Sequence, residues 1–179
     1  MTSLVWKPAT AHPELMAPST AAAVEGLSFA DEVEAVAIDP AISDTAALVE
    51  ATGMDLADSA NCVIVAGKRD GVERVAALLV LANTRADINN VVRRHLDVRK
   101  ISFMAMDDAV SRSGMEYGGI TPIGLPQEWP VLVDAAVLQR SSIVIGSGIR
   151  AGKLRLPGAR AAELPNVAVI DGMARIVDA

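Results

Sequence analysis

The sequence predicts an α+β fold in a single domain, built on a mixed, mostly antiparallel sheet or a partial barrel with flanking helices. Short β-prone segments crowd the second half of the chain, whereas helical patterns are scattered between strands in the first half. Half of the 179 residues are hydrophobic, which is enough for one core, and no linker divides the chain. The late strands are predicted at 131–134, 142–146, 153–156 and 167–170.

The chain is expected to begin with an extended lead-in, residues 1–18, before the folded domain at 19–179. The lead-in contains three prolines and shows no sustained hydrophobic periodicity. Ser19 or Thr20 then precedes an alanine-rich stretch that stops at Gly26, which is typical of a short capped helix.

Alternating or continuously apolar runs predict the strands of the first half. These runs are rich in valine, isoleucine and alanine, and Gly, Pro or Asp stands near their ends. A polar five-residue loop, 67–71, joins two of them into a hairpin. The strands predicted in this way are 32–38, 62–66, 74–82 and 100–103.

Aspartates predict the starts of three helices, because their side chains accept from the free N–H groups of a first turn. Asp44 precedes one apolar-periodic stretch, and Asp87 precedes another with helical hydrophobic spacing. Asp107 or Asp108 is expected to cap a third, short helix that Gly114 ends.

Composition and charge narrow the possible functions. A single cysteine excludes an internal disulfide and fits a reducing cytoplasm, where we expect the protein to act away from any membrane. The net charge of −6 is uneven, since residues 1–60 carry ten acids and one lysine (−9) and the remainder carry fifteen bases and twelve acids (+3). The second part of the chain is therefore the side that faces a polyanion, or its bases serve only solubility.

Residues 114–126 are the most informative stretch of the sequence. Between Gly118 and Gly124, three glycines and a proline occupy seven positions. Glycine lets a backbone approach a ligand closely and reach positive φ, while proline fixes its own φ. The main-chain N–H groups of this loop are thus available to hold something small and electron-rich; the alternative is a tight structural turn.

The order of segments resembles the YbaK family, whose members are similar to the editing domain inserted in bacterial prolyl-tRNA synthetases. The resemblance rests on the glycine loop, a Leu-Val-Asp strand at 132–134 and the turn Gly146-Ser147-Gly148. It implies a freestanding enzyme that hydrolyses, in trans, the ester joining an incorrect amino acid to the 3′ adenosine of a tRNA. The implied partner is the aminoacylated acceptor end of that tRNA.

The resemblance also implies the residues of the site. Backbone amides of the 118–122 loop would form an oxyanion hole for the ester carbonyl. The loop residues implied in catalysis are Gly118, Gly119, Ile120, Thr121 and Pro122. The residues implied in substrate binding are Asn61, Gly124, Asp134, Gly146, Ser147 and Gly148.

Several of these residues could have a purely structural role instead of a role in the site. Many family members carry a lysine where Asn61 stands, so Asn61 either binds substrate through its amide or only opens a strand. Asp134 either braces the glycine loop or binds the α-ammonium group of the substrate. The Gly146-Ser147-Gly148 segment is either a second pocket wall or a plain turn. Cys62 is expected to fill the core, so no side-chain nucleophile is predicted.

The leading hypothesis is an aminoacyl-tRNA deacylase that uses no metal and no cofactor. The alternatives are a non-catalytic module that binds aminoacyl-tRNA or an amino-acid-like ligand, and a hydrolase of small acyl compounds. The oligomeric state is open, and a homodimer is compatible with the sequence. The basic residues that either contact phosphates of the acceptor stem or are simply solvated are Arg85, Arg93, Arg94, Arg99, Lys100, Arg150 and Lys153.

Overall fold

The computed structural model describes residues 2–177, which form three sheets flanked by short helices. The strand orders are β1-β2-β9-β8, β10-β7-β4-β3-β6 and β11-β5. The strands are β1 Lys7–Pro8, β2 Glu34–Ala37, β3 Ala60–Arg69, β4 Val72–Leu81, β5 Thr84–Ala86, β6 Lys100–Phe103, β7 Val131–Asp134, β8 Ile143–Gly146, β9 Gly152–Leu156, β10 Val167–Ile170 and β11 Ala174–Ile176.

The helices are short. The α-helices are α1 Pro18–Glu25, α2 Thr45–Thr52, α3 Arg93–His95, α4 Met106–Ser113 and α5 Ala135–Leu138. The 3-10 turns are η1 Ala9–Ala11, η2 Pro13–Leu15, η3 Ala30–Glu32, η4 Pro40–Ile42, η5 Leu56–Asp58 and η7 Gly158–Glu163, and η6 Ile88–Val92 is a π-helical turn. Within residues 2–177, no helix reaches the length and apolarity that a membrane crossing requires.

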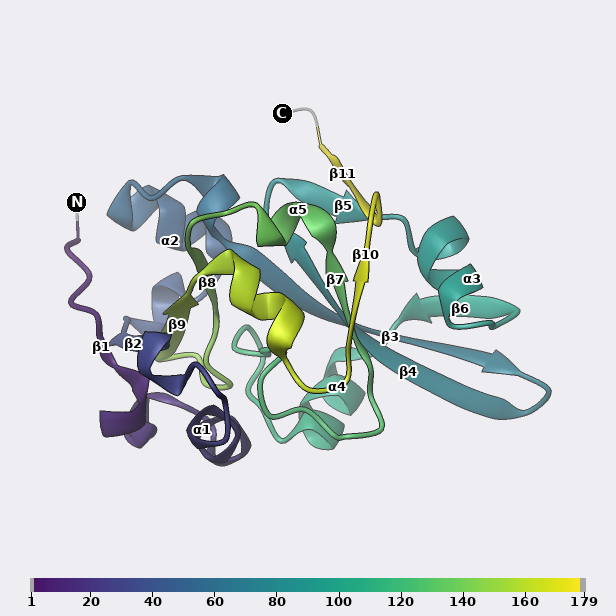
Figure 1. Ribbon diagram of the computed structural model, residues 1–179, viewed down its shortest axis with the longest axis horizontal. Coiled ribbons are helices and arrows are strands. Elements are labelled where there is room, and N and C mark those ends of the chain that lie inside the picture. The colour runs from purple at the N-terminus through teal and green to yellow at the C-terminus, as the bar shows by residue number, and fades with distance from the viewer. Residues whose placement is uncertain (1, 178–179) are drawn as a thin grey trace.

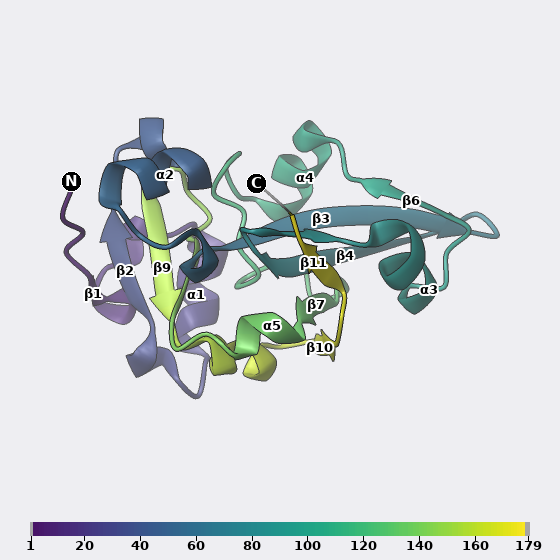
Figure 2. The same ribbon diagram turned by 90° about the horizontal axis from the view of Figure 1, so that it is seen from above.

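The predicted α+β class with a mixed, mostly antiparallel sheet is confirmed. Strand β7 pairs in parallel with both β10 and β4, and the other ladders are antiparallel. The strands of the described residues form three sheets and no closed barrel. Figure 1 shows the sheet that contains β2 and β9 at one end of the molecule and the long β3–β4 hairpin projecting at the other, and Figure 2 shows the same division from above.

Three clusters of buried hydrophobic side chains pack the sheets and helices against one another. The largest lies between the two main sheets and joins Leu154 and Ile145 of the small sheet to Leu79 and Val133 of the large one. A second covers the other face of the large sheet under η6 and α3. The third packs α2 against the outer face of the small sheet, around Leu48. Both sheets are therefore covered on two faces.

Strand β4 lies in the middle of the five-stranded sheet because its sequence is apolar on both faces. From Val75 to Leu81 every residue is buried, with alternate side chains entering the first and second clusters. Such a continuous apolar run is typical of a strand covered on both sides. The predicted five-residue loop of the hairpin is wrong, since β3 and β4 pair up to a two-residue turn, Asp70-Gly71, with φ of 52° and 82°. Positive φ at both positions is what a tight hairpin turn needs.

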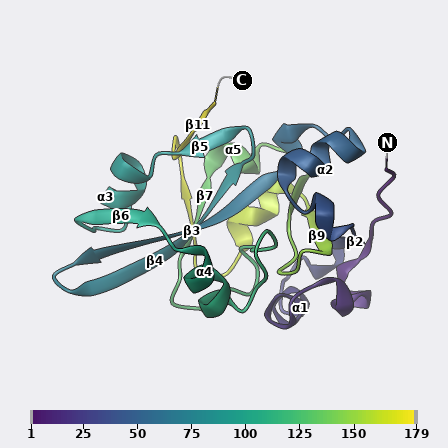
Figure 3. The ribbon, with the colours of Figure 1, turned by 180° about the vertical axis from the view of Figure 1, so that it is seen from behind.

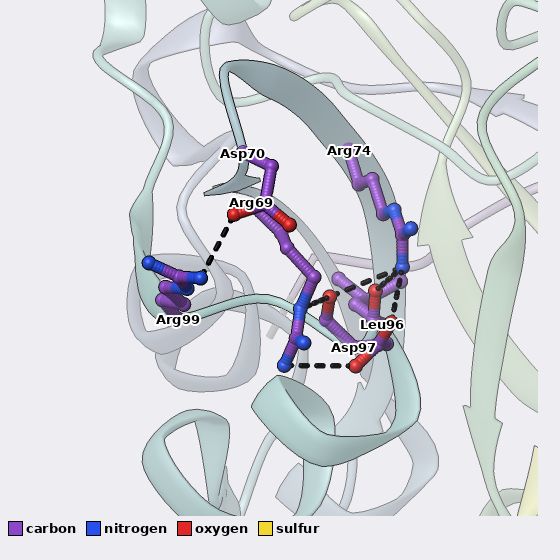
Figure 4. A network of polar contacts seen from close by, with 6 residues as sticks. All are labelled: Arg69, Asp70, Arg74, Leu96, Asp97 and Arg99. Carbon is purple, nitrogen blue, oxygen red and sulfur yellow. Dashed lines mark hydrogen bonds and ion pairs between the residues drawn. The ribbon is translucent and has the colours of Figure 1, made fainter.

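Ion pairs fix the far end of this hairpin against the segment after α3 (Figure 4). Arg69 and Arg74 both contact the carboxylate of Asp97, at 3.0 and 3.2 Å, and Arg74 also donates to the carbonyl of Leu96 at 2.8 Å. Arg99 pairs with Asp70 at 2.8 Å. All these pairs are well exposed, so each contributes at most about 1 kcal/mol to stability. They orient the hairpin end rather than hold the fold together.

The helix caps differ in part from those predicted. Asp44 accepts from Ala46 N–H and caps α2 as expected. Helix α1, however, begins at Pro18 with Ala17 as its N-cap, so neither Ser19 nor Thr20 caps it. Helix α4 begins with Met106 after Ala105 and has no side-chain cap. Proline at a first helical position explains the earlier start of α1, because it lacks only an N–H that has no helical partner there.

Residues 2–18 contain short ordered elements that pack against the small sheet. Strand β1 pairs with β2, and two 3-10 turns follow it. Ala9 is fully buried, and Met16 and Ala17 are 5% and 2% exposed. Ala17 N–H also donates to the carbonyl of Ser147 at 2.9 Å. This segment thus closes one side of the small sheet.

Because β4 is buried on both faces, Leu78→Ala and Leu79→Ala should destabilise the protein alike, although the two side chains point in opposite directions. Both are 0% exposed, and truncating such a leucine costs about 2–5 kcal/mol. Urea unfolding followed by circular dichroism measures the loss, with the 60%-exposed Val72 changed to Ala as the control. A loss at only one of the two leucines would contradict the two-sided packing.

Candidate functional site

A pocket of about 630 Å³ opens where the two main sheets meet. Strand β6 pairs only with Val65–Lys68 of β3, so the first half of β3 has no strand on that side. There β3 approaches the small sheet, and Ser59 forms a bridge with Val144 of β8. Helix α2 and the loop between α4 and β7 complete the walls. Figure 3 shows this loop between the hairpin and the end of the molecule that holds α1 and β9.

The glycine loop presents alternate residues to the pocket. Gly118 and Ile120 line it. Among the described residues, the N–H groups of Gly118 and Ile120 have no hydrogen-bond acceptor, whereas the N–H of Gly119 donates to Glu116 O at 3.0 Å. Gly118 is exposed and Ile120 is half-buried, so the N–H of Gly118 is open to solvent and that of Ile120 is partly shielded from it. Two uncommitted donors beside a cavity can therefore serve a ligand oxygen.

The other loop residues point into the protein. A Cβ on Gly119 would lie 2.7 Å from the backbone of Ile149, so this glycine serves backbone packing and not the approach of a carbonyl. Thr121 is fully buried and its N–H contacts Met115 Sδ at 3.5 Å. Pro122 is buried as well. Of the five residues predicted in catalysis, the structure brings two to the pocket.

The turn after β8 holds the glycine loop in place. Gly148 N–H donates to Gly119 O at 2.7 Å, and Gly148 O accepts from Glu116 N–H at 2.8 Å. Arg150 adds a clamp, because its guanidinium donates to Tyr117 O at 3.2 Å and to Pro40 O at 3.1 Å. Its side chain also lies 5.4 Å from the centre of the Tyr117 ring.

The segment Gly146-Ser147-Gly148 thus has two roles: Gly146 lines the pocket, and Gly148 holds the glycine loop in place. Gly146 lines the pocket, and a Cβ there would lie 2.3 Å from Gly119 O. Ser147 is fully buried, and its hydroxyl contacts Ile149 O at 3.5 Å. Gly148 takes φ of 85°, which favours glycine. Ser147 and Gly148 do not reach the pocket.

Asn61 lines the pocket and is hydrogen-bonded to α2. Its Oδ1 accepts from Thr45 Oγ1 at 2.9 Å. The amide NH₂ group has no acceptor among the described residues. Thr45 follows Asp44, whose carboxylate accepts from Ala46 N–H at 2.9 Å. Asn61 therefore does more than open a strand, because it joins β3 to the first turn of α2.

A lysine does line the pocket, although β9 supplies it instead of β3. Lys153 is only 7% exposed, and its Nζ donates to Ser43 O at 2.8 Å. Burial lowers the pKa of Lys153; Asp44 acts against this shift and Arg150 adds to it. The sequence predicts Lys153 as a phosphate contact or a solvated base and does not reveal its burial in the pocket, because the alternation in β9 is typical of a strand whose polar face meets water. In the structure, α2 covers that face.

Cys62 also lines the pocket while packing against the main core. Burial raises the pKa of its thiol to about 12. The thiol is therefore protonated at neutral pH, and a protonated thiol is a poor nucleophile. The structure places Cys62 against the core, as the sequence predicts.

Asp134 and Gly124, both predicted in substrate binding, do not line the pocket. Both carboxylate oxygens of Asp134 accept from backbone, Oδ1 from Ala136 N–H at 3.0 Å and Oδ2 from Ala174 N–H at 2.7 Å. Asp134 thus caps α5 and fixes the start of β11, and it contacts neither the glycine loop nor the cavity. Gly124 packs against α1, where a Cβ would lie 2.5 Å from Ser19 O.

Comparison with solved structures identifies the fold. A candidate trans-editing enzyme for prolyl-tRNA synthetase superimposes with a TM-score of 0.72 at 18% identity, covering 86% of this chain and 96% of the other. A scaffold protein from a computational epitope-grafting study gives 0.72 at 18%, covering 87% and 97%. A candidate signal transduction protein from Marinobacter aquaeolei gives 0.57 at 18%, covering 89% of this chain and 30% of the other. No curated protein matches the sequence.

Comparison with protein families identifies the sequence itself. The model of the aminoacyl-tRNA editing domain family matches residues 39–164. This chain therefore belongs to the aminoacyl-tRNA editing domain family, as the resemblance to YbaK proteins implied. The matched region includes α2, the first half of β3, the glycine loop and β9, so it contains the whole pocket.

Asp134→Ala should lower stability without changing the pocket. The substitution leaves two backbone N–H groups without acceptors, and each such loss costs about 1–3 kcal/mol. Asp134→Asn keeps an acceptor oxygen and should lose less. Urea unfolding measures both variants. A variant that retains its stability but loses activity would instead place Asp134 in the substrate site.

Proposed function

We propose that this protein is a trans-editing aminoacyl-tRNA deacylase of the cytoplasm, which hydrolyses the ester between an amino acid and the 3′ adenosine of tRNA. Family membership supports editing in general. The observation that carries the hydrolytic assignment is the pair of uncommitted N–H groups at Gly118 and Ile120, both on the pocket wall.

These two donors fit the charge that develops during ester hydrolysis. When water attacks the carbonyl carbon, negative charge accumulates on the former carbonyl oxygen. Preorganised backbone donors stabilise that charge without reorganising, and removing one such donor in other enzymes slows the reaction about 10²–10³-fold. The backbone braces from Gly148 and the Arg150 clamp hold the loop ready for this role.

Water is the proposed nucleophile. The thiol of Cys62 is protonated, and neither histidine lines the pocket. The NH₂ group of Asn61 and the carboxylate of Asp44 supply a donor and an acceptor that can orient the amino acid and its α-ammonium group. The apolar wall, which includes Leu48, Val63 and Ile145, would contact its side chain.

Gly118→Ala should reduce deacylation, because residue 118 has φ of 75° and a Cβ there would lie 3.0 Å from the Arg150 guanidinium. Displacing this segment moves an oxyanion donor, so we expect a fall in kcat/KM of about tenfold or more. Release of radiolabelled amino acid from a panel of misacylated tRNAs provides the measurement. The matched control is Gly71→Ala, a glycine with φ of 82° and open space around it at the hairpin turn.

The panel also tests the function itself. Failure of the unaltered protein to release any amino acid above buffer hydrolysis, while it still binds aminoacyl-tRNA, would establish the non-catalytic alternative. An equal loss in Gly118→Ala and Gly71→Ala would show that only backbone strain matters, and would remove the support for an oxyanion hole at the glycine loop.

If tRNA is the substrate, kcat/KM should fall steeply as salt rises. Contacts to several phosphates release bound counterions, so affinity decreases with a log–log slope of about −0.7 to −0.9 per phosphate. Deacylation of intact aminoacyl-tRNA and of a minimal aminoacyl-adenosine should be measured between roughly 50 and 200 mM KCl, where phosphate contacts weaken markedly. The comparison separates the salt dependence of tRNA binding from that of ester hydrolysis. Equal salt dependence of both substrates would favour a hydrolase of small acyl compounds.

A further inference from the structure

The ammonium group of Lys153 is buried and forms no ion pair within the described residues. The side chain is 7% exposed, and the only hydrogen bond that its Nζ makes within the described residues is to Ser43 O, at 2.8 Å. No carboxylate of the described chain lies within ion-pair distance of it. An ammonium has three N–H donors, so two are left. A buried charge without a partner destabilises a protein, which makes such a residue a candidate for ligand binding.

Strand register places this ammonium beside the glycine loop. Lys153 is the cross-strand partner of Gly146, and such partners project from the same face of a sheet. On that face, a Cβ on Gly146 would lie 2.3 Å from Gly119 O and 2.6 Å from Ile120 O. The backbone of residues 119 and 120 therefore lies directly over Gly146, next to the position from which the Lys153 side chain leaves the sheet.

Gly118 of the glycine loop also lies close to Ser43, the residue that binds the ammonium group of Lys153. A Cβ on Gly118 would lie 3.3 Å from Ser43 Oγ, and Ser43 is the residue whose carbonyl holds Lys153 Nζ. Gly118, Ser43 and Lys153 are thus successive neighbours along the pocket wall. Ser43, Gly118, Ile120 and Lys153 all line one cavity.

We propose that Lys153 is a catalytic residue, whose ammonium group completes the oxyanion site formed by the N–H groups of Gly118 and Ile120. This assignment rests on the proposed deacylase function. It deepens that function by giving the site a full positive charge in addition to backbone dipoles.

The chemical step balances with Lys153 protonated throughout. Water adds to the ester carbon while the carbonyl π-electrons move to the oxygen, which Lys153 and the two backbone N–H groups stabilise. The carbonyl then re-forms as the bond to the ribose oxygen breaks. The proton lost by the attacking water ends on that ribose oxygen, so the products are the free amino acid and a 3′-hydroxyl. Lys153 transfers no proton.

The charge requirement sets the direction of the pH dependence. Burial lowers the pKa of Lys153 from its usual value, while Asp44 at the start of α2 opposes this and Arg150 from the β8–β9 turn adds to it. The other titratable groups that line the pocket are Cys62 and Tyr117. Activity should therefore decrease as pH rises through the lowered pKa of Lys153, and the pKa of the protein-bound lysine can be followed by ¹⁵N NMR of its side chain.

Two substitutions of Lys153 separate the contribution of its charge from that of its packing. K153M removes the charge and keeps the length of the side chain, and K153Q can also keep the hydrogen bond to Ser43 O. Both should fold, because replacing an unpaired buried charge removes a destabilising group, and we expect urea midpoints no lower than that of the unaltered protein. Both should lose about 100-fold in kcat with little change in KM. The control is K7M, an exposed lysine at the edge of the same sheet.

Stable analogues test the site independently of turnover. A phosphonate analogue of aminoacyl-adenosine carries the tetrahedral anion, and the corresponding amide analogue carries only a neutral carbonyl. K153M should weaken phosphonate binding at least tenfold in calorimetry and leave amide binding within about threefold, a split that a purely structural lysine does not produce. This measurement succeeds even if the protein does not hydrolyse aminoacyl-tRNA, in which case only the proposed function fails.

Three results would overturn the role of Lys153. The first is a rise in KM without a fall in kcat, which would make the lysine an anchor for a phosphate. The second is a loss confined to aspartyl and glutamyl esters, which would make it a specificity residue for acidic side chains. The third is equal weakening of both analogues, or no binding of either by the unaltered protein.

Discussion

The site depends on a close approach of two backbones, the glycine loop and the turn after β8. Gly148 N–H donates to Gly119 O, and Gly148 O accepts from Glu116 N–H. A side chain at Gly119 or Gly146 would enter the opposing backbone, at 2.7 and 2.3 Å. Because the two segments touch main chain to main chain, the hydrogen-bonding groups on one side of the loop are consumed. Those of Gly118 and Ile120, on the other side, remain for the pocket.

This packing explains how one loop is rigid and still has unpaired donors. A loop with every N–H group paired would have no donor for a ligand oxygen. A loop without hydrogen bonds to neighbouring segments would not keep its conformation. Here the partners of the loop are Gly148, which does not line the pocket, and the guanidinium of Arg150, which lies at the pocket wall. The arrangement resembles what catalysis by fixed dipoles requires, since the donors are positioned before any charge develops.

Much of the fold could be predicted from the sequence because its signals are local. Asp44 and Gly114 act at helix ends where side-chain chemistry decides the outcome, and β7, β6 and β10 occur at the predicted positions. The site could be predicted less well. Glycines have several uses, and only the structure shows that Gly118 borders the pocket while Gly119 and Gly124 serve packing. Asp134 is a carboxylate at the end of an apolar strand, as a site residue could be, yet one of its oxygens caps the adjacent α5 and the other accepts from Ala174 N–H, forty residues away.

Lys153 illustrates the limit of pattern analysis most clearly. Along β9, apolar Leu154 and Leu156 enter the core, and the alternate positions hold Lys153 and Arg155. This alternation is the usual sign of a solvated face. Arg155 agrees with that pattern, since its side chain is 35% exposed and forms an ion pair with Glu34. Lys153, two residues earlier, is covered by the Ser43–Thr45 segment that begins α2. Whether a polar strand position meets water or a cavity is decided by an element about a hundred residues away in the sequence, and no local pattern carries that information.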